Sequence, residues 1–130
     1  MARLAFAGVA VGILLAVAGC GGKTTYTLTR TKTCLTERSV QIGGPLPLDF
    51  VARTATGGAM VAHLGDNFAT IAFGQDLSGG VNIELAYTRF SSKNIQNGLS
   101  DVLRRYNNAV TLWHMHPSDS DLALVVGCLR

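Results

Sequence analysis

The stretch AMVAHLGDNFATIAF, residues 59–73, decides the fold of this chain. It contains two apolar runs, residues 59–64 and 68–73, which are joined by Gly65-Asp66-Asn67. Two strand-like runs separated by a short turn with glycine are typical of a β-hairpin. We therefore predict an antiparallel hairpin at the centre of the fold, with Gly74 ending its second strand.

Helices are expected outside the hairpin, because apolar residues recur there at helical spacing. One helix should cover residues 48–55 and end at the glycine pair 57–58, and another should cover residues 81–90. A third helical stripe is formed by Leu99, Val102, Leu103 and Tyr106. We therefore predict a helix over residues 99–106 that ends at Asn107-Asn108.

The C-terminal segment is expected to be a strand followed by a helix. Residues 109–115 form an apolar run that predicts a strand. Pro117-Ser118-Asp119 is typical of a helix start, because it offers a capping side chain and acidic residues in the first turn. The apolar face of this last helix would be formed by Leu122, Val125, Val126 and Leu129.

The segment over residues 26–42 allows two interpretations. Its threonines favour a strand, whereas Leu28, Thr31 and Leu35 recur at helical spacing. We expect a short extended start, a helix around Cys34 and a strand over residues 40–42. The complete pattern predicts one α+β domain over residues 26–130, with helices packed on a small antiparallel sheet.

The N-terminus has the organisation of a secretion signal. Arg3 supplies a positive charge, residues 4–17 are almost continuously apolar, and Val17-Ala18-Gly19-Cys20 follows. The apolar segment is shorter than the roughly 20 residues that a transmembrane helix needs, and an uncleaved N-terminal anchor is the alternative. The stretch resembles a bacterial lipoprotein signal peptide with its lipobox.

This resemblance implies that residues 1–19 are a removed signal peptide and that Cys20 is lipidated on its sulfur. The lipid would hold the domain on the extracytoplasmic face of the cell membrane, with residues 20–25 as a short tether. The mature domain resembles small uncharacterised lipoproteins of actinobacterial type. Neither resemblance implies an activity or a site residue beyond Cys20.

The assignment of Cys20 to lipid leaves two further cysteines, Cys34 and Cys128. An even number of cysteines in an oxidising compartment predicts a disulfide between them. Two buried free thiols are the alternative. A disulfide would close nearly the whole domain into one loop, and the chain-entropy description values such a closure at about 4–5 kcal/mol.

The charge pattern restricts the classes of partner. The chain has 11 basic and 8 acidic residues, and without Arg3 the balance is ten to eight. No stripe of lysine and arginine is present, so nucleic-acid binding has little support. Arg104-Arg105, the only adjacent basic pair, is interpreted as a solvated helix face, with contact to anionic lipid headgroups as the alternative.

The histidines are the strongest candidate ligands for a metal. On a strand, His114 and His116 would point to the same face, and two imidazoles at this spacing suit copper or zinc. His63, in the predicted hairpin, would add a third ligand if its strand lay alongside. The alternative is a strand end with two exposed histidines and no metal, and we expect no resident cofactor.

The run His114-Met115-His116-Pro117, followed by Ser118 and Asp121, resembles part of the JAMM metalloisopeptidase signature. That family has a longer spacer before its serine and aspartate and a glutamate on an upstream strand. Here the spacer is absent, and Glu37 and Glu84 lie in predicted helices. Ser118 and Asp121 are therefore interpreted as the cap and first turn of the last helix.

No nucleophile elbow and no phosphate loop is found in the sequence, and we predict a protein without catalytic activity. The principal hypothesis is a lipid-anchored accessory or binding domain at the cell envelope, with an envelope protein as its partner. The alternative is a metal-binding lipoprotein that uses His114 and His116.

Overall fold

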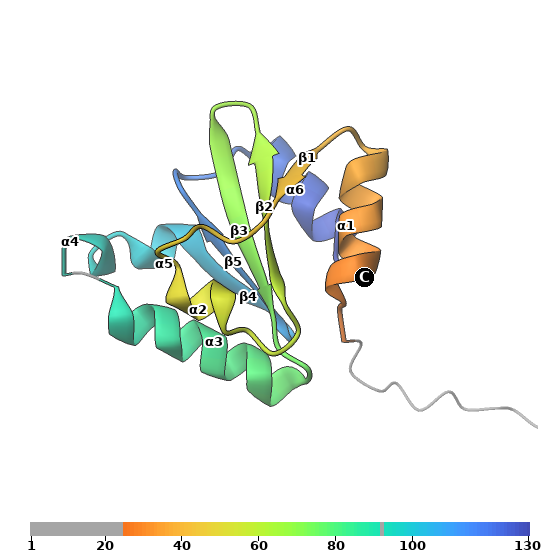
Figure 1. The fold of residues 1–130 in the computed structure, drawn as a ribbon. Coiled ribbons are helices and arrows are strands. Elements are labelled where there is room, and N and C mark those ends of the chain that lie inside the picture. Colours follow the sequence, from red (N-terminus) through yellow and green to blue (C-terminus); the bar gives the residue numbers. More distant parts are fainter. Residues whose placement is uncertain (1–24, 92) are drawn as a thin grey trace, which may run out of the picture.

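A computed structural model describes residues 25–91 and 93–130. The elements follow in the order α1 (Leu28–Glu37), β1 (Gln41–Gly43), α2 (Phe50–Arg53), β2 (Ala59–Leu64), β3 (Asn67–Phe73), α3 (Leu77–Phe90), α4 (Lys93–Gln96), α5 (Leu99–Val102), β4 (Leu103–Tyr106), β5 (Ala109–Trp113) and α6 (Asp119–Cys128). The five strands form one sheet in the order β1-β2-β3-β5-β4, and every neighbouring pair is antiparallel. Helices flank this sheet on both sides (Figure 1), which confirms the predicted α+β fold.

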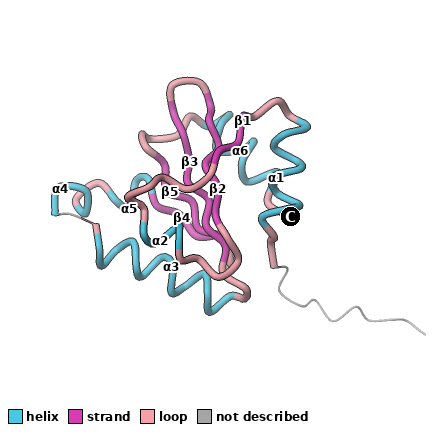
Figure 2. Tube along the Cα trace, in the orientation of Figure 1, coloured by secondary structure: helices cyan, strands magenta, loops and turns pink. Residues whose placement is uncertain are grey.

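The predicted hairpin forms the two central strands β2 and β3. Their register runs from Ala59 opposite Ala72 to Leu64 opposite Asn67. Gly65 takes a φ of 61°, a left-handed conformation that glycine adopts without steric cost. The turn is therefore tighter than predicted, because Asn67 already belongs to the second strand. The tip of the hairpin extends beyond the neighbouring helices (Figure 2).

The two faces of the sheet carry separate apolar clusters. On the side of α1 and α6, which we call the disulfide face, the core includes Leu35, Phe73, Trp113 and Val125. On the side of α2 and α3, which we call the groove face, a smaller cluster is formed by Ala72, Ile83, Tyr87 and Val110. Because successive side chains along a strand point to opposite faces of the sheet, the same strands supply residues to both clusters.

A disulfide joins α1 to α6 and confirms the predicted pairing. The sulfur atoms of Cys34 and Cys128 are 2.13 Å apart, and the two Cα atoms are 5.4 Å apart, within the usual range for a disulfide. Next to it, the backbone N–H of Thr27 donates to the carbonyl of Arg130 at 2.7 Å. The start of α1 and the C-terminal end of the chain are therefore fixed to each other.

Hydrogen bonds also hold the first described residues at the turn between β4 and β5. The buried Asn108 accepts from the Tyr26 N–H at 2.7 Å, and its amide donates to the carbonyls of Tyr26 and Gly74, each at 2.8 Å. Gly80, in the first turns of α3, lies so close that a Cβ atom there would be 2.5 Å from the Asn107 carbonyl oxygen. The domain thus begins beside the N-terminal end of α3.

The prediction of a helix over residues 99–106 is wrong for its second half. Only Leu99–Val102 is helical, and Leu103–Tyr106 is strand β4. Asn107 takes a φ of 52° and lets the chain reverse, so that Tyr106 pairs with Ala109 and β4 gains a full ladder with β5. Arg104 and Arg105 therefore lie on a sheet edge and not on a helix face, because pairing with β5 outweighs the helical spacing.

Other boundaries differ by a few residues from the prediction. Residues 28–37 are helical after an extended start, as expected. The helix predicted over residues 48–55 is confined to Phe50–Arg53, and α3 begins at Leu77 because Asp76 caps it. The last helix begins as predicted, since the Ser118 hydroxyl accepts from the Asp121 N–H at 3.1 Å.

The predicted signal peptide, Cys20 and all of the tether except Thr25 lie outside the described residues. Within residues 25–91 and 93–130, no helix is long and apolar enough to cross a membrane.

Candidate functional site

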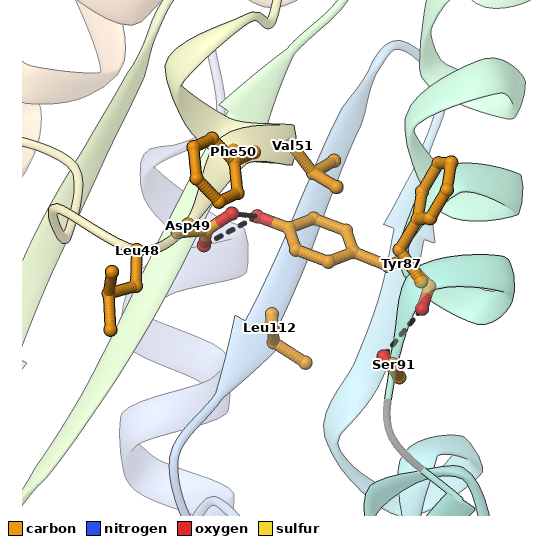
Figure 3. A pocket seen from close by; sticks show the side chains of 8 residues that line it. Leu48, Asp49, Phe50, Val51, Tyr87, Ser91 and Leu112 are labelled. Atoms are coloured by element: carbon orange, nitrogen blue, oxygen red, sulfur yellow. Dashed lines mark hydrogen bonds between the residues drawn. The ribbon is translucent and has the colours of Figure 1, made fainter.

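A pocket of about 570 Å³ opens on the groove face, where the start of α2 approaches the C-terminal end of α3 (Figure 3). Its lining residues are Leu48, Asp49, Phe50, Val51, Tyr87, Phe90, Ser91 and Leu112. Most of these side chains are apolar, and one polar pair lies among them. A concave, mostly apolar pocket with a few fixed polar groups is typical of a binding site.

Asp49 positions the first wall of the pocket. One of its carboxylate oxygens accepts from the Ala52 N–H at 2.9 Å and so caps the short helix α2. The Arg53 guanidinium donates to the Pro47 carbonyl at 2.9 Å and fixes the segment that leads into the helix. The side chains on both sides of Asp49 are consequently left in solvent: Leu48 is 85% exposed and Phe50 is 67% exposed.

Tyr87 of α3 closes the pocket from the other side. Its hydroxyl donates to the Asp49 carboxylate, at 3.1 Å from one oxygen and 2.9 Å from the other (Figure 3). Burial, and then the negative charge and the hydrogen bond of Asp49, raise the pKa of the Tyr87 phenol well above its usual value. The phenol therefore remains a protonated donor, and the pair joins α2 to α3 without carrying protons.

The floor and the far wall of the pocket come from β5 and the end of α3. Leu112 projects from β5 on the groove face, where its partner in the ladder is Leu103 of β4. The Ser91 hydroxyl donates to the Tyr87 carbonyl and ends α3. Phe90, the last residue of α3, is 74% exposed. The pocket is thus apolar at its floor and at both of its edges.

The exposed apolar surface continues beyond this pocket. Phe50 and Phe90 also line a second hollow between α2 and α3, and Phe90 lines a third one together with Leu85. Four large apolar side chains that are more than half exposed therefore adjoin one another: Leu48, Phe50, Leu85 and Phe90. We call these four residues the apolar rim. An exposed apolar patch of this kind indicates an interaction surface.

The structure places His63 and His114 on the groove face with an aromatic ring between them. Phe68 of β3 pairs with His63 of β2, and its carbonyl accepts from the His114 N–H at 2.9 Å. The Phe68 ring stacks on the His114 ring with centroids 4.6 Å apart, and it lies 6.1 Å from the His63 ring. The two imidazoles thus contact Phe68 from opposite sides.

His116 has a different partner. Its Nδ1 atom lies 2.7 Å from a carboxylate oxygen of Asp101, in α5. The strand predicted to reach residue 115 ends at Trp113, because the Asn67 side chain replaces the ladder there. Its amide donates to the Met115 carbonyl at 3.0 Å, and its oxygen accepts from the Met115 N–H at 2.9 Å.

The sequence predicts that His114 and His116 point to the same face of a strand. This prediction is wrong, because strand β5 ends at Trp113. In the described parts of the chain, no three histidine, cysteine, aspartate or glutamate side chains are arranged to hold a metal ion. Metal binding by the two histidines alone stays a prediction.

The serine and the acidic residues weighed for a hydrolase lie on three different helices. Ser118 caps α6, and Asp121 lies in its first turn, as predicted. Glu37 lies in α1, and Glu84 lies in α3, where it pairs with Arg105 at 3.5 Å. Within the described residues, none of the contacts given above joins Ser118, Asp121, Glu37 or Glu84 to a histidine.

Sequence reasoning missed the contact between Asp49 and Tyr87 and the apolar rim. The helical spacing of the sequence places Leu48, Phe90 and Val126 on the apolar faces of their helices, yet all three side chains are exposed. A signal was present in Leu46, Leu48 and Phe50, which alternate around prolines and a capping aspartate. A helix of one turn buries only one side, so these large side chains could not all reach the core.

Among known proteins, no family, no curated protein and no solved structure matches this chain. The pocket and the apolar rim, together with the N-terminal signal predicted from the sequence, are therefore the features on which a functional proposal can rest.

Proposed function

We propose that this protein is a lipid-anchored extracytoplasmic domain that acts by binding, without catalysis, at the cell envelope. The observation that carries the proposal is the pocket on the groove face with Leu48, Phe50 and Phe90 exposed at its edges. Burial of such side chains against a partner removes apolar area from water, which is the main favourable term in association.

The polar groups of the pocket support binding more than chemistry. The Asp49 carboxylate accepts from Ala52 and from Tyr87, and the phenol uses its proton on that carboxylate. The raised pKa of Tyr87 makes it a poor proton carrier at neutral pH. What the pocket offers a partner is a fixed apolar surface.

The lipobox Val17-Ala18-Gly19-Cys20 supports the location. Two acyl chains hold a protein on a membrane stably, whereas one does so only marginally. A diacylglyceryl group on Cys20 would therefore keep the domain at the membrane surface. Confinement there raises its effective concentration toward partners in the same membrane.

The anchor is tested with Cys20→Ala in a bacterium that processes lipoproteins. We expect the wild-type chain in the membrane fraction with the mass of a lipid-modified Cys20, and we expect the variant to lose that modification. A wild-type protein without lipid would contradict the anchor.

The binding role is tested by chemical crosslinking in native membranes. A Phe50→Ser/Phe90→Ser variant should lose most crosslinked material that the wild-type protein retains. Val126→Ser is the matched control, because Val126 is exposed on α6. Equal crosslinking by all three proteins would contradict a binding role for the pocket.

A further inference from the structure

We infer that the apolar rim rests on the anionic phospholipid surface to which the chain is anchored, so that α3 lies against the membrane. This inference rests on the proposed anchor at Cys20, and it names the occupant of the groove face.

The tether leaves the domain beside the N-terminal end of α3. Tyr26 is held by two hydrogen bonds to Asn108, and Gly80 of α3 packs on the backbone of the same Asn107-Asn108 turn. In Figure 1, α3 lies along the lower side of the molecule and begins near this turn. The point at which the tether joins the domain therefore lies beside the N-terminal end of α3.

The reach of the tether agrees with contact between the rim and the bilayer. The six peptide steps from Cys20 to Tyr26 span at most about 20 Å when fully extended. Helix α3 has 14 residues, and a helix of that number of residues is about 21 Å long. The length of α3 and the maximum length of the tether are therefore about equal. Leu85 and Phe90 lie within this distance of the N-terminal end of α3.

The composition of this side fits an anionic lipid interface. The exposed Arg53 is one turn after Phe50 in α2, and the exposed Arg89 stands between Leu85 and Phe90 and lines the same hollow. Of the acidic groups on this side, Glu84 pairs with Arg105, Asp49 accepts hydrogen bonds from Tyr87 and Ala52, and Asp76 caps the start of α3. Phenylalanine and leucine side chains flanked by arginines are typical of surfaces that enter the headgroup region.

Among the side chains that the structure describes, the remaining large exposed apolar ones do not form a second surface of this kind. Leu46, Met115 and Val126 are less than half exposed and lie on separate segments. The anionic bilayer is therefore the occupant that the tether, the apolar rim and the two arginines favour together.

The test uses the full lipidated protein in phosphatidylcholine vesicles that contain phosphatidylglycerol and lipids with brominated acyl chains. Phe90→Trp places a reporter at the rim, and Val126→Trp places the matched reporter on α6. Both positions are exposed, so neither substitution should disturb folding. Trp113 is buried and common to both proteins, so its emission is subtracted with the wild-type spectrum.

We expect the emission of the tryptophan at position 90 to shift to the blue and to fall at least about twofold with brominated lipid, as for a side chain in the headgroup and acyl boundary. The tryptophan at position 126 should change little. Adding Arg53→Glu and Arg89→Glu to Phe90→Trp, or omitting phosphatidylglycerol, should weaken the quenching.

Three other outcomes would overturn the inference, and the measurements distinguish them from one another. Protein that floats with the vesicles but shows no quenching at position 90 retains the anchor and contradicts membrane contact. A tryptophan at position 90 that is shielded from iodide but insensitive to brominated lipid indicates a second copy or another protein on the rim. Protein that does not float with the vesicles contradicts the anchor and, with it, this inference.

Discussion

The two faces of the sheet bury their large apolar side chains to very different degrees. On the disulfide face, Trp113 is 2% exposed and Phe73 is fully buried beneath α1 and α6. On the groove face, Phe50 and Phe90 are 67% and 74% exposed although their helices contact the same sheet. One face is therefore closed by a core and a covalent bond, whereas the other leaves large apolar side chains exposed to solvent.

This difference separates the residues that stabilise the domain from those that we propose to act. Substitutions on the disulfide face should change the free energy of unfolding, because they remove buried packing. Substitutions of the apolar rim should change binding and leave stability nearly unaltered, as is usual for exposed sites. The predictions below test this separation, from the largest effect to the smallest.

The disulfide should contribute the largest single effect. Replacing both Cys34 and Cys128 with alanine should lower the free energy of unfolding by about 2–5 kcal/mol, as for native disulfides of small secreted domains. Urea unfolding of the variant and of the wild-type protein, with and without reductant, measures the loss. An unchanged unfolding midpoint would show that the packing of α1 on α6 is sufficient without the bond.

The Asp49–Tyr87 contact should be next in size. Tyr87→Phe removes the hydroxyl and leaves a half-buried carboxylate with fewer donors, which should cost about 1.5–3 kcal/mol, as for hydrogen bonds to charged groups. Urea unfolding measures the cost, and Thr88→Val on the exposed side of α3 is the matched control. A loss no greater than that of the control would mean that the contact does not join α2 to α3.

The same contact predicts a dependence of stability on alkaline pH. Because the pKa of Tyr87 is raised in the folded state, the stability it adds is fully present below the unfolded value of about 10. It is lost as pH rises above that value, since the unfolded chain then releases the proton first. The difference in unfolding free energy between wild type and Tyr87→Phe should therefore shrink above pH ~10, and a constant difference would contradict the raised pKa.

The rim itself should affect stability little. Phe50→Ser/Phe90→Ser should change the free energy of unfolding by no more than about 0.5 kcal/mol at each exposed site, while it removes membrane or partner contact. Thermal unfolding beside the vesicle assay checks both parts. A large loss of stability would place these rings in the core and would end the contrast between the two faces.

The histidines should give the smallest effect. His114→Ala/His116→Ala should change stability by about 0.5 kcal/mol or less, because both rings are exposed. If the pair holds copper or zinc, titration should show weaker binding by the variant than by the wild-type protein. Equal binding by the two proteins would remove the metal hypothesis.

The features that the sequence predicted well depend on local rules. The hairpin follows from two apolar runs around Gly65, and α6 follows from the Ser118 cap. The bond between Cys34 and Cys128 followed from counting cysteines once Cys20 was assigned to lipid. Each of these inferences needs only neighbouring residues or a count, so the rest of the fold could not alter it.

The features that were missed depend on tertiary contacts. Leu103 and Tyr106 lie at helical spacing, yet they form β4, because β5 offers a strand partner next to them. Asp49 and Tyr87 are 38 residues apart, and no local pattern joins them. The exposure of Phe90 was unpredictable for the same reason, since its place in the sequence suggested the buried side of α3.

The most direct test of the account is photo-crosslinking in native membranes, with a benzophenone amino acid placed at Phe90 and, separately, at Val126 of the full chain. The account predicts phospholipid adducts, detected by mass, from position 90 on the groove face and few or none from position 126. Equal adducts from both positions, or none from position 90, would contradict the claim that the groove face is the side that meets the membrane.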